Sequence, residues 1–389
     1  MLTEHFHNTQ KDTGHYSNDL RYVLSLQNTI AAFEEIKTWE GYAKTPLHSL
    51  DSMASDIGVK NIYYKDESSR FGLGSFKALG GTYGVLKFIH HALKKEIGDE
   101  VSMKDIHAGK YSEQISKYTV TTATDGNHGR SVAFGAKLFG CKCQIYIHSE
   151  VSSGRQKAME DLEATVNRVS GNYDESLQIC IEDAGKNNWY VISDTSYEGY
   201  TKYPRYIMAG YNVMAEEIID QIKDRPLPTH VFLQGGVGSF PGAICGYFWE
   251  KFPGNNIKFV VVESEHAPCL IRSAQNNQMT SVNIKQETMM AGLSCGEPSL
   301  LGWEILKSGT DDFITINDSS IPGLMRLLAK NNLKIEAGES SVAGLAGLIE
   351  SMEDQKIAEA MELNKESIVL LFGTEGATDP DIYRSIISE

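Results

Sequence analysis

The chain has 389 residues, 41% of them hydrophobic and 22% charged, which is ordinary for a globular protein with a sizeable core. Its 36 basic and 51 acidic side chains give a formal net charge of −15, and this disfavours nucleic acid as a partner because phosphate backbones are also negative. The N-terminus lacks the pattern of a signal peptide, and no run approaches the ~18 apolar residues of a membrane span. We therefore expect a cytoplasmic protein.

Short runs rich in β-branched and aromatic residues alternate with longer helical patterns along most of the chain. Strands are expected at 61–65, 118–122, 143–148, 166–169, 190–194, 230–234, 258–264 and 367–372, and helices at 75–97, 127–139 and 153–163. This alternation predicts the α/β class, with mostly parallel sheets and crossover helices. The polar stretch 98–117 interrupts the rhythm and is expected to be a surface insertion. Any ligand cleft should lie at the carboxyl ends of the strands.

Lys77 is the first candidate functional residue, in the segment RFGLGSFKALGG at 70–81. Phe76, Ala78 and several glycines surround it in the sequence, and no carboxylate lies within three residues. We therefore expect this lysine to occupy a dry, glycine-lined setting without a compensating charge. Desolvation of that kind lowers the pKa of a lysine and makes its amine nucleophilic.

A polar turn, DGNHG, separates the strand at 118–122 from the helix at 127–139. Its two glycines would let a ligand approach the backbone closely. Asn127 can donate a hydrogen bond to a ring oxygen, and Asp125 can accept a proton, but helix capping explains Asp125 equally well. For His128, a place beside the helix N-cap is a simpler interpretation than catalysis.

Two further strand ends carry polar side chains. Asp194 ends the strand at 190–194 and would face a cleft, although many such residues only cap loops. Thr374 follows the strand at 367–372 between two glycines, where its hydroxyl can contact a heterocycle or simply belong to a turn.

The segment GGVGS at 235–239 follows the strand at 230–234 and precedes a helical pattern. Its glycines allow a tight turn with bare N–H groups, and the helix N-terminus behind them favours an anion. The GxGxxG pattern of dinucleotide sites is not met, because the third glycine after Gly236 and Gly238 is replaced by Pro241 and the next glycine is Gly242. We interpret the segment as a cup for a monophosphate, with a plain strand-to-helix turn as the alternative.

A nucleophilic lysine and a separate monophosphate cup are together what a Schiff-base cofactor requires. Pyridoxal phosphate has an aldehyde for the lysine and a phosphate for the cup, and its ring withdraws electrons from the substrate's Cα. The cysteines do not suggest a metal, because Cys141 and Cys143 have no second cluster of ligands nearby in the sequence and are better read as buried strand residues.

The order of these motifs resembles that of the tryptophan-synthase-β-like (fold type II) pyridoxal-phosphate enzymes, and most closely the diaminopropionate ammonia-lyase branch. The resemblance covers the chain from about residue 30 onward and is carried by SFKALGG at 75–81, TATDGNHGR at 122–130, SDTSYEGY at 193–200, GGVGS at 235–239, AGLSCGEPS at 291–299 and FGTEGATDP at 372–380. Dehydratases of this fold usually show S-x-G-N in the second motif. This chain has an acid there, Asp125, which favours an ammonia-lyase.

The resemblance implies two open parallel-sheet domains with the cofactor in the cleft between them, paired as a homodimer. The large domain would comprise 1–80 and 201–389, and a smaller mobile domain 81–200. The implied reaction converts 2,3-diaminopropionate and water to pyruvate and two ammonia, from either enantiomer. A serine or threonine dehydratase and, less readily, a nucleotide-binding α/β protein without this cofactor are the alternatives.

The resemblance also assigns roles to residues. Lys77 would bind the cofactor, and Asp125 and Asp194 would remove the Cα proton from the D- and L-isomers, respectively, because the two hydrogens lie on opposite faces. Asn127 would contact the ring hydroxyl and Thr374 the ring nitrogen. The phosphate would accept N–H groups from Gly235, Gly236, Val237, Gly238 and Ser239.

Cys269 and Cys295 lie in loop-like contexts in the second half of the chain. Reduced thiols are the simpler expectation in the cytosol. We nevertheless hypothesise that the two lie close enough to form a disulfide that tethers a loop near the cleft.

Overall fold

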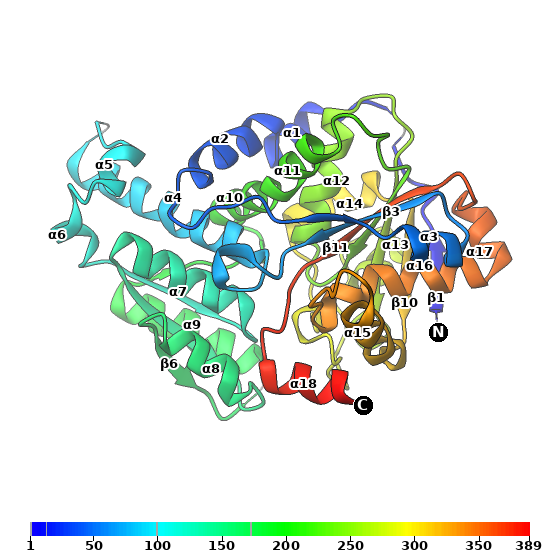
Figure 1. The fold of residues 1–389 in the computed structure, drawn as a ribbon. Helices are drawn as coiled ribbons and strands as arrows, with labels where there is room; N and C mark the ends of the chain where they lie inside the picture. The colour runs from blue at the N-terminus through cyan, green and yellow to red at the C-terminus, as the bar shows by residue number, and fades with distance from the viewer. Residues whose placement is uncertain (1, 13, 99, 172) are drawn as a thin grey trace. The chain divides into compact units, whose positions relative to one another are not determined.

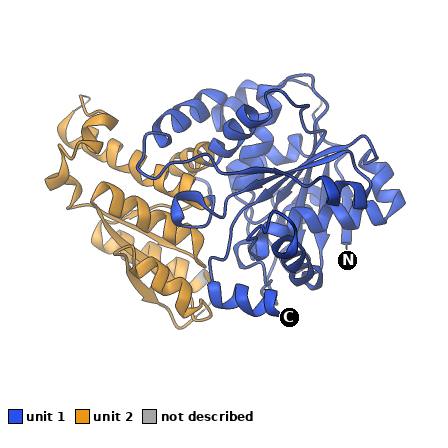
Figure 2. Cartoon of the chain, viewed as in Figure 1, with its two compact units in different colours: residues 1–76, 195–198, 211–389 blue, residues 77–194, 199–210 orange. Residues whose placement is uncertain are grey.

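The computed structural model describes residues 2–389 except 13, 99 and 172. The chain forms two compact units, a large unit of residues 1–76, 195–198 and 211–389 and a small unit of residues 77–194 and 199–210 (Figure 2). The sequence placed the boundaries after residues 80 and 200, whereas the small unit begins at Lys77 and also includes residues 199–210.

The large unit is built on a sheet of seven strands in the order β1-β10-β9-β8-β11-β3-β2 (Figure 1). The five central strands are parallel, whereas β1 and β2 pair antiparallel at the two edges. The bounds are β1 (Leu2–His7), β2 (Leu47–Ser49), β3 (Asn61–Asp66), β8 (His230–Gln234), β9 (Lys258–Ser264), β10 (Asp312–Ile316) and β11 (Ile368–Gly373). Strand β9, KFVVVES, is buried from its second residue onward, as expected for the centre of a sheet that is covered on both faces.

The helices of the large unit are α1 (Asn18–Val23), α2 (Leu26–Ile36), α3 (Asp51–Ile57), α11 (Val213–Gln221), α12 (Ser239–Lys251), α13 (Cys269–Asn276), α14 (Leu300–Gly309), α15 (Ile321–Lys330), α16 (Ala343–Glu353), α17 (Gln355–Ala360) and α18 (Pro380–Ser388). Short 3₁₀ turns occur at Arg70–Gly72, Ala291–Leu293, Asp318–Ser320 and Glu339–Val342. Helix α16 packs on β8, β9 and β10, and its Leu345 and Leu348 join Phe232, Val262 and Ile314 in the main core.

The small unit is built on a parallel sheet in the order β6-β5-β4-β7. Its strands are β4 (Thr119–Ala123), β5 (Lys142–Ile147), β6 (Thr165–Arg168) and β7 (Tyr190–Val191), and its helices are α4 (Lys77–Ile97), α5 (Met103–His107), α6 (Ser112–Ile115), α7 (Asn127–Phe139), α8 (Ser153–Glu160), α9 (Tyr173–Asn187) and α10 (Lys202–Tyr211). Helices α7 and α9 both pack on β4 and β5, and α4 packs along α7. In the described part of the chain, no helix is both long and apolar enough to cross a membrane.

Most predicted elements are confirmed, several of them to the residue, as in α7, β8 and β9. The strand predicted at 190–194 is wrong after Val191, because the hydroxyl of Tyr200 donates to the Val191 carbonyl (2.9 Å) and accepts from the Ser193 N–H (3.0 Å). The helix predicted from residue 75 begins at Lys77. The polar stretch 98–117 contains the short helices α5 and α6.

A buried cluster of charged side chains fixes the segment between β3 and α4. The Arg70 guanidinium contacts Glu67 Oε2 through Nε (2.7 Å) and Glu217 Oε2 through Nη2 (2.8 Å), and Lys65 Nζ also reaches Glu217 (2.7 Å). All four side chains are almost inaccessible to water. Burial alone would raise the pKa of the Glu217 carboxyl, but hydrogen bonds and charge from Arg70 and Lys65 outweigh burial and hold that pKa well below its ordinary value.

The substitution Arg70→Met tests this cluster. It removes one of two cations and leaves two buried carboxylates with a single cationic partner, Lys65, so we expect the free energy of unfolding to fall by about 3–5 kcal/mol. Denaturant unfolding measures the change. The matched control is Arg384→Met, which removes an arginine that is 70% exposed and paired with Asp381, and we expect a loss below about 1 kcal/mol. Equal effects of the two substitutions would contradict the assignment of stability to the buried cluster.

Candidate active site

Polar side chains follow the ends of three neighbouring parallel strands of the small unit, β4, β5 and β7. In the pairing of β4 with β5, Ala123 lies opposite Tyr146, and the same register continued by two residues brings Asp125 opposite His148. In the pairing of β4 with β7, Thr121 lies opposite Val191, so Asp194 follows β7 on the same side of the sheet. Because the carboxyl ends of parallel strands meet at one edge, these side chains share that edge.

Lys77 is the first residue of α4, and its ammonium group forms an ion pair with Asp194. The Ser131 hydroxyl of α7 donates to the Lys77 carbonyl (2.6 Å), which fixes the start of α4. The expectation of an uncompensated lysine in a dry setting is therefore wrong: the side chain is 20% exposed and has a carboxylate partner 117 residues away in the sequence. No local pattern could reveal that partner.

His128 lies beside the same pair. Its Nε2 donates to the Ile192 carbonyl (2.8 Å), and its Nδ1 lies 3.9 Å from Asp194 Oδ2. Burial lowers the pKa of this imidazole more than the Asp194 charge raises it, so the ring is neutral at neutral pH. The interpretation of His128 as a simple neighbour of a helix cap missed this contact.

The turn that carries Asp125 is organised by Thr124. The Thr124 hydroxyl accepts hydrogen bonds from the N–H groups of Gly126 and Gly129, both at 3.0 Å, so Thr124 rather than Asp125 caps the first turn of α7. Gly126 has φ +156°, a conformation that favours glycine. Asn127 is the first residue of α7. The Asp125 carboxylate therefore does not cap the helix. His148 Nε2 contacts its Oδ1 at 2.9 Å.

The segment 235–239 of the large unit, here called the glycine loop, follows β8 and leads into α12. Gly238, at φ +98°, is the N-cap of that helix. The first N–H groups of a helix lack carbonyl partners within it, so this end suits an anion. One predicted donor is wrong, since the Gly235 N–H already donates to the Val262 carbonyl (2.7 Å) within the sheet.

The glycine loop is held close to α14 by a second glycine, Gly302. A Cβ atom at Gly302 would lie 2.5 Å from the Gly238 carbonyl oxygen and 3.0 Å from the Ser239 nitrogen. In the same contact, a Cβ at Gly242 would lie 2.9 Å from Gly302 Cα. The Val237 carbonyl accepts from the Ser299 N–H (2.6 Å). The loop therefore takes its shape from a helix that begins more than 60 residues later, which sequence reasoning did not identify.

Thr374 is buried just after β11, and its hydroxyl lies 3.3 Å from that of Ser340. Its carbonyl accepts from the Phe76 N–H (3.1 Å), and Ser75 forms a β-bridge with Glu375. The residues that immediately precede Lys77 are thus tied to the end of β11. Ser340 is a second buried hydroxyl at this position, and no sequence motif pointed to it.

The disulfide hypothesis is wrong, since no disulfide joins Cys269 and Cys295 in the structure. They do flank the same glycine of the loop. The Cys269 thiol donates to the Gly236 carbonyl (3.6 Å), and a Cβ at Gly236 would lie 3.5 Å from Cys295 Sγ.

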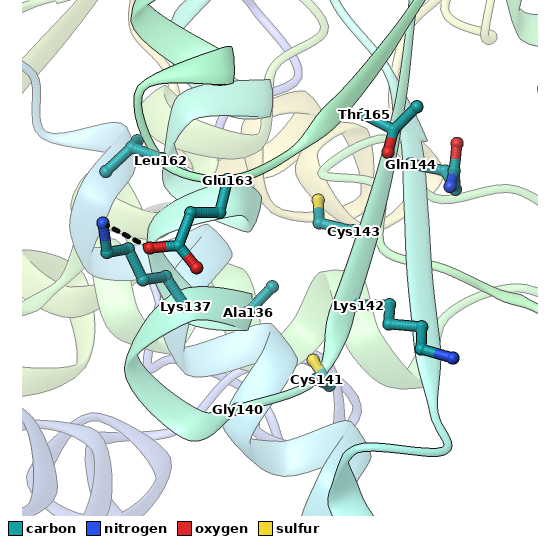
Figure 3. A pocket seen from close by; sticks show the side chains of 10 residues that line it. All are labelled: Ala136, Lys137, Gly140, Cys141, Lys142, Cys143, Gln144, Leu162, Glu163 and Thr165. Carbon is teal, nitrogen blue, oxygen red and sulfur yellow. Dashed lines mark ion pairs between the residues drawn. The ribbon is translucent and has the colours of Figure 1, made fainter.

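A pocket in the small unit lies at the other edge of its sheet, where β5 and β6 begin at Lys142 and Thr165 (Figure 3). Its rim carries an ion pair between Lys137 and Glu163 (2.9 Å). Cys141 also lines it, and burial raises the pKa of that thiol to about 12, which keeps it protonated at neutral pH. Because Asp125 and Asp194 follow the opposite strand ends, this pocket is separate from the candidate site.

Comparison with known proteins decides the family. The family described as "Pyridoxal-phosphate dependent enzyme" matches residues 38–373. The diaminopropionate ammonia-lyase of Escherichia coli K12 is 38% identical over 357 residues, which cover 90% of this chain and 88% of that protein. The chain belongs to the pyridoxal-phosphate-dependent enzymes and, among them, to the diaminopropionate ammonia-lyase family.

Solved structures agree with this assignment. The crystal structure of the E. coli diaminopropionate ammonia-lyase with an aminoacrylate–pyridoxal-phosphate azomethine intermediate matches all of this chain and 97% of that one, with a TM-score of 0.88 and 34% identity. A probable D-serine dehydratase of Carboxydothermus hydrogenoformans is more distant, at 26% identity over 80% of this chain. The predicted fold class, α/β of fold type II, is confirmed.

Taken separately, each unit carries residues that fit a part of the cofactor. In the small unit, Lys77 carries the kind of amine that the aldehyde of pyridoxal phosphate would need. The phosphate of the cofactor needs N–H donors with no side chain in the way, which the glycine loop and the start of α12 provide. Thr374 and Ser340 offer buried hydroxyl groups for a ring atom.

The substitution Gly302→Ala tests the glycine loop. The new methyl group would meet the backbone of the glycine loop, and no rotamer change relieves that contact. We therefore expect the free energy of pyridoxal phosphate binding to weaken by about 1–3 kcal/mol, or roughly a 5- to 150-fold rise in Kd. Titration of cofactor-free protein measures this. Pyridoxal, which lacks the phosphate, should be affected much less.

The control is Gly323→Ala in α15, where a Cβ meets no atom within 4 Å. A Gly302→Ala protein that binds pyridoxal phosphate as tightly as the control would exclude a role for this contact in shaping the loop.

Proposed function

We propose that this protein converts 2,3-diaminopropionate, in both the D and L forms, and water to pyruvate and two ammonia. The observation that carries the proposal is the pairing of Lys77 with one acid, Asp194, while a second acid, Asp125, ends the neighbouring strand. A simple dehydratase acting on one isomer needs only one base. Membership of the diaminopropionate ammonia-lyase family supports the substrate.

When bound, pyridoxal phosphate supplies an aldehyde for amines and a ring that withdraws electrons from the substrate's Cα. We propose that Lys77 binds the aldehyde and that Asn127 donates to the ring hydroxyl. The N–H groups of Gly236, Val237, Gly238 and Ser239 would bind the phosphate, with Gly235 supporting the turn. Thr374 would contact the ring nitrogen, and an uncharged partner there would leave that nitrogen unprotonated, which suits elimination.

Each of the two acids acts on one enantiomer of the substrate, for a geometric reason. The Cα hydrogens of the D- and L-isomers lie on opposite faces of the bound substrate, so a single fixed base reaches only one of them. Asp125 removes the proton from the D-isomer and Asp194 from the L-isomer, after Lys77 has given up its ion pair with Asp194 to bind cofactor. A carboxylate is then needed at each position, and general bases of this kind contribute about 10²–10⁴ in rate.

Release of pyruvate from each enantiomer of 2,3-diaminopropionate, compared with serine, tests the proposed function. We expect kcat/KM to be higher for diaminopropionate than for serine, and we expect Lys77→Ala to lose both turnover and the visible absorption of the lysine-bound cofactor. A preference for serine would favour the dehydratase alternative. An active Lys77→Ala protein with its visible band intact would exclude this lysine.

Exchanging each acid for its amide tests the division of labour. We expect Asp125→Asn to lower kcat for the D-isomer by about 10²–10⁴ with little effect on the L-isomer, and Asp194→Asn to do the reverse. Because Asp194 also pairs with Lys77, the visible spectrum of each variant is needed to show that cofactor is bound. If both variants bound cofactor normally and lost both isomers equally, the assignment of one base to each face would fail.

We further propose that the protein acts as a homodimer in the cytoplasm and that the small unit is mobile during the reaction. The sparse, scattered cysteines of the sequence support the compartment, because secreted disulfide frameworks are denser in cysteine.

A further inference from the structure

We propose that His148 is a positioning residue that holds the Asp125 carboxylate for proton removal from the D-isomer. The proposal rests on the function proposed above for Asp125. It assigns a role to an imidazole that the sequence did not single out, and it starts from one contact, between His148 Nε2 and Asp125 Oδ1, at 2.9 Å.

The backbone brings these two residues together. Asp125 and His148 follow adjacent parallel strands, at positions that continue the register in which Ala123 lies opposite Tyr146. Just past β4, the Thr124 N–H donates to the Tyr146 carbonyl (3.0 Å). This bond holds the turn after β4 beside the turn after β5. The contact therefore follows from strand register and does not depend on a chance arrangement of surface side chains.

The turn that carries His148 is itself fixed. Arg168, at the end of β6, donates through Nη1 to the carbonyls of His148 (3.2 Å), Ser149 (2.7 Å) and Val151 (2.8 Å). The His148 side chain is only 12% exposed. An imidazole held this way limits the rotation of the carboxylate that it contacts.

The hydrogen bonds also indicate which ring nitrogen carries the proton. The Glu150 N–H points at His148 Nδ1 (3.4 Å), so Nδ1 is the acceptor in the neutral ring and Nε2–H is the donor. The nitrogen that carries the proton, Nε2, is therefore the one that contacts Asp125 Oδ1. This contact places a polar N–H group against one oxygen of the carboxylate and restricts its position.

The second acid has different neighbours. Asp194 contacts Lys77 and lies 3.9 Å from His128 Nδ1, and both partners are separate from His148. Loss of the His148 imidazole should therefore disturb one acid and spare the other. This separation makes the proposal testable within a single enzyme, because the L-isomer serves as an internal reference.

The test compares His148→Leu, which removes the donor, with His148→Gln, whose amide N–H reaches about as far as Nε2. We expect His148→Leu to lower kcat for D-diaminopropionate roughly 10- to 100-fold through misplacement of the base. The KM and the kcat for the L-isomer should stay within about twofold. His148→Gln should recover most of the loss, because its amide again places an N–H group against Asp125. A deuterium at Cα of the D-isomer should give a larger isotope effect in His148→Leu, since proton removal becomes slower.

Two controls accompany these variants. His15→Leu, an exposed histidine of the large unit, should match the unsubstituted protein for both isomers. The Kd for pyridoxal phosphate and the thermal midpoint of the cofactor-free protein should be similar in all variants, which separates positioning from misfolding.

The outcomes separate the proposed role of Asp125 from the proposed role of His148. If Asp125→Asn spares the D-isomer, the proposed role of Asp125 fails, and this inference fails with it. If Asp125→Asn is selective for the D-isomer but His148→Leu is not, or His148→Gln is as impaired as His148→Leu, the inference alone is overturned.

Discussion

The Arg70 guanidinium joins two buried carboxylates, Glu67 and Glu217, that repel each other without it. Glu67 lies just after β3, and its N–H also donates to the Gly373 carbonyl at the end of β11 (2.8 Å). The segment between β3 and α4 is therefore fixed at both ends, first by the ionic cluster and then by the bonds of Ser75 and Phe76 to the turn after β11. Lys77 is the next residue, and the small unit begins with it.

Strand order explains why so few residues define the chemistry of the small unit. Strand β4 is flanked by β5 and β7, and all three are parallel. The residues that follow the three strands therefore lie at the same edge of the sheet. Two carboxylates and two imidazoles gather there, and each carboxylate has different neighbours: Asp194 faces Lys77 and His128, and Asp125 faces His148. Different neighbours let two chemically identical groups act separately.

Much of the fold could be predicted because its central strands carry strong local patterns. The run KFVVVES in β9 has the pattern of a buried strand in any context. Strands β1, β2 and β10 were not predicted. Strand β10, with the sequence DFITI, is short and begins with an acid, and the edge strands β1 and β2 each pair with one strand only. The local motifs also selected Lys77, Asp125 and Asp194. What they could not provide was pairing over distance. His148 becomes relevant only through the register of β4 with β5, and Gly302 only through its contact with Gly238. The Gly235 N–H was assigned to phosphate because the sequence does not show which sheet bonds are already made.

Lys77 is the first residue of the small unit, and Asp194 is the last residue of its long segment. Their ion pair therefore joins the two points at which the chain enters and leaves that segment. The long segment of the small unit is thus an insert whose first and last residues are joined by a side-chain contact. Because the entropy of closing a loop grows only slowly with its length, residues added between these two ends, for example in the stretch 98–117, would cost little in the closure of the insert.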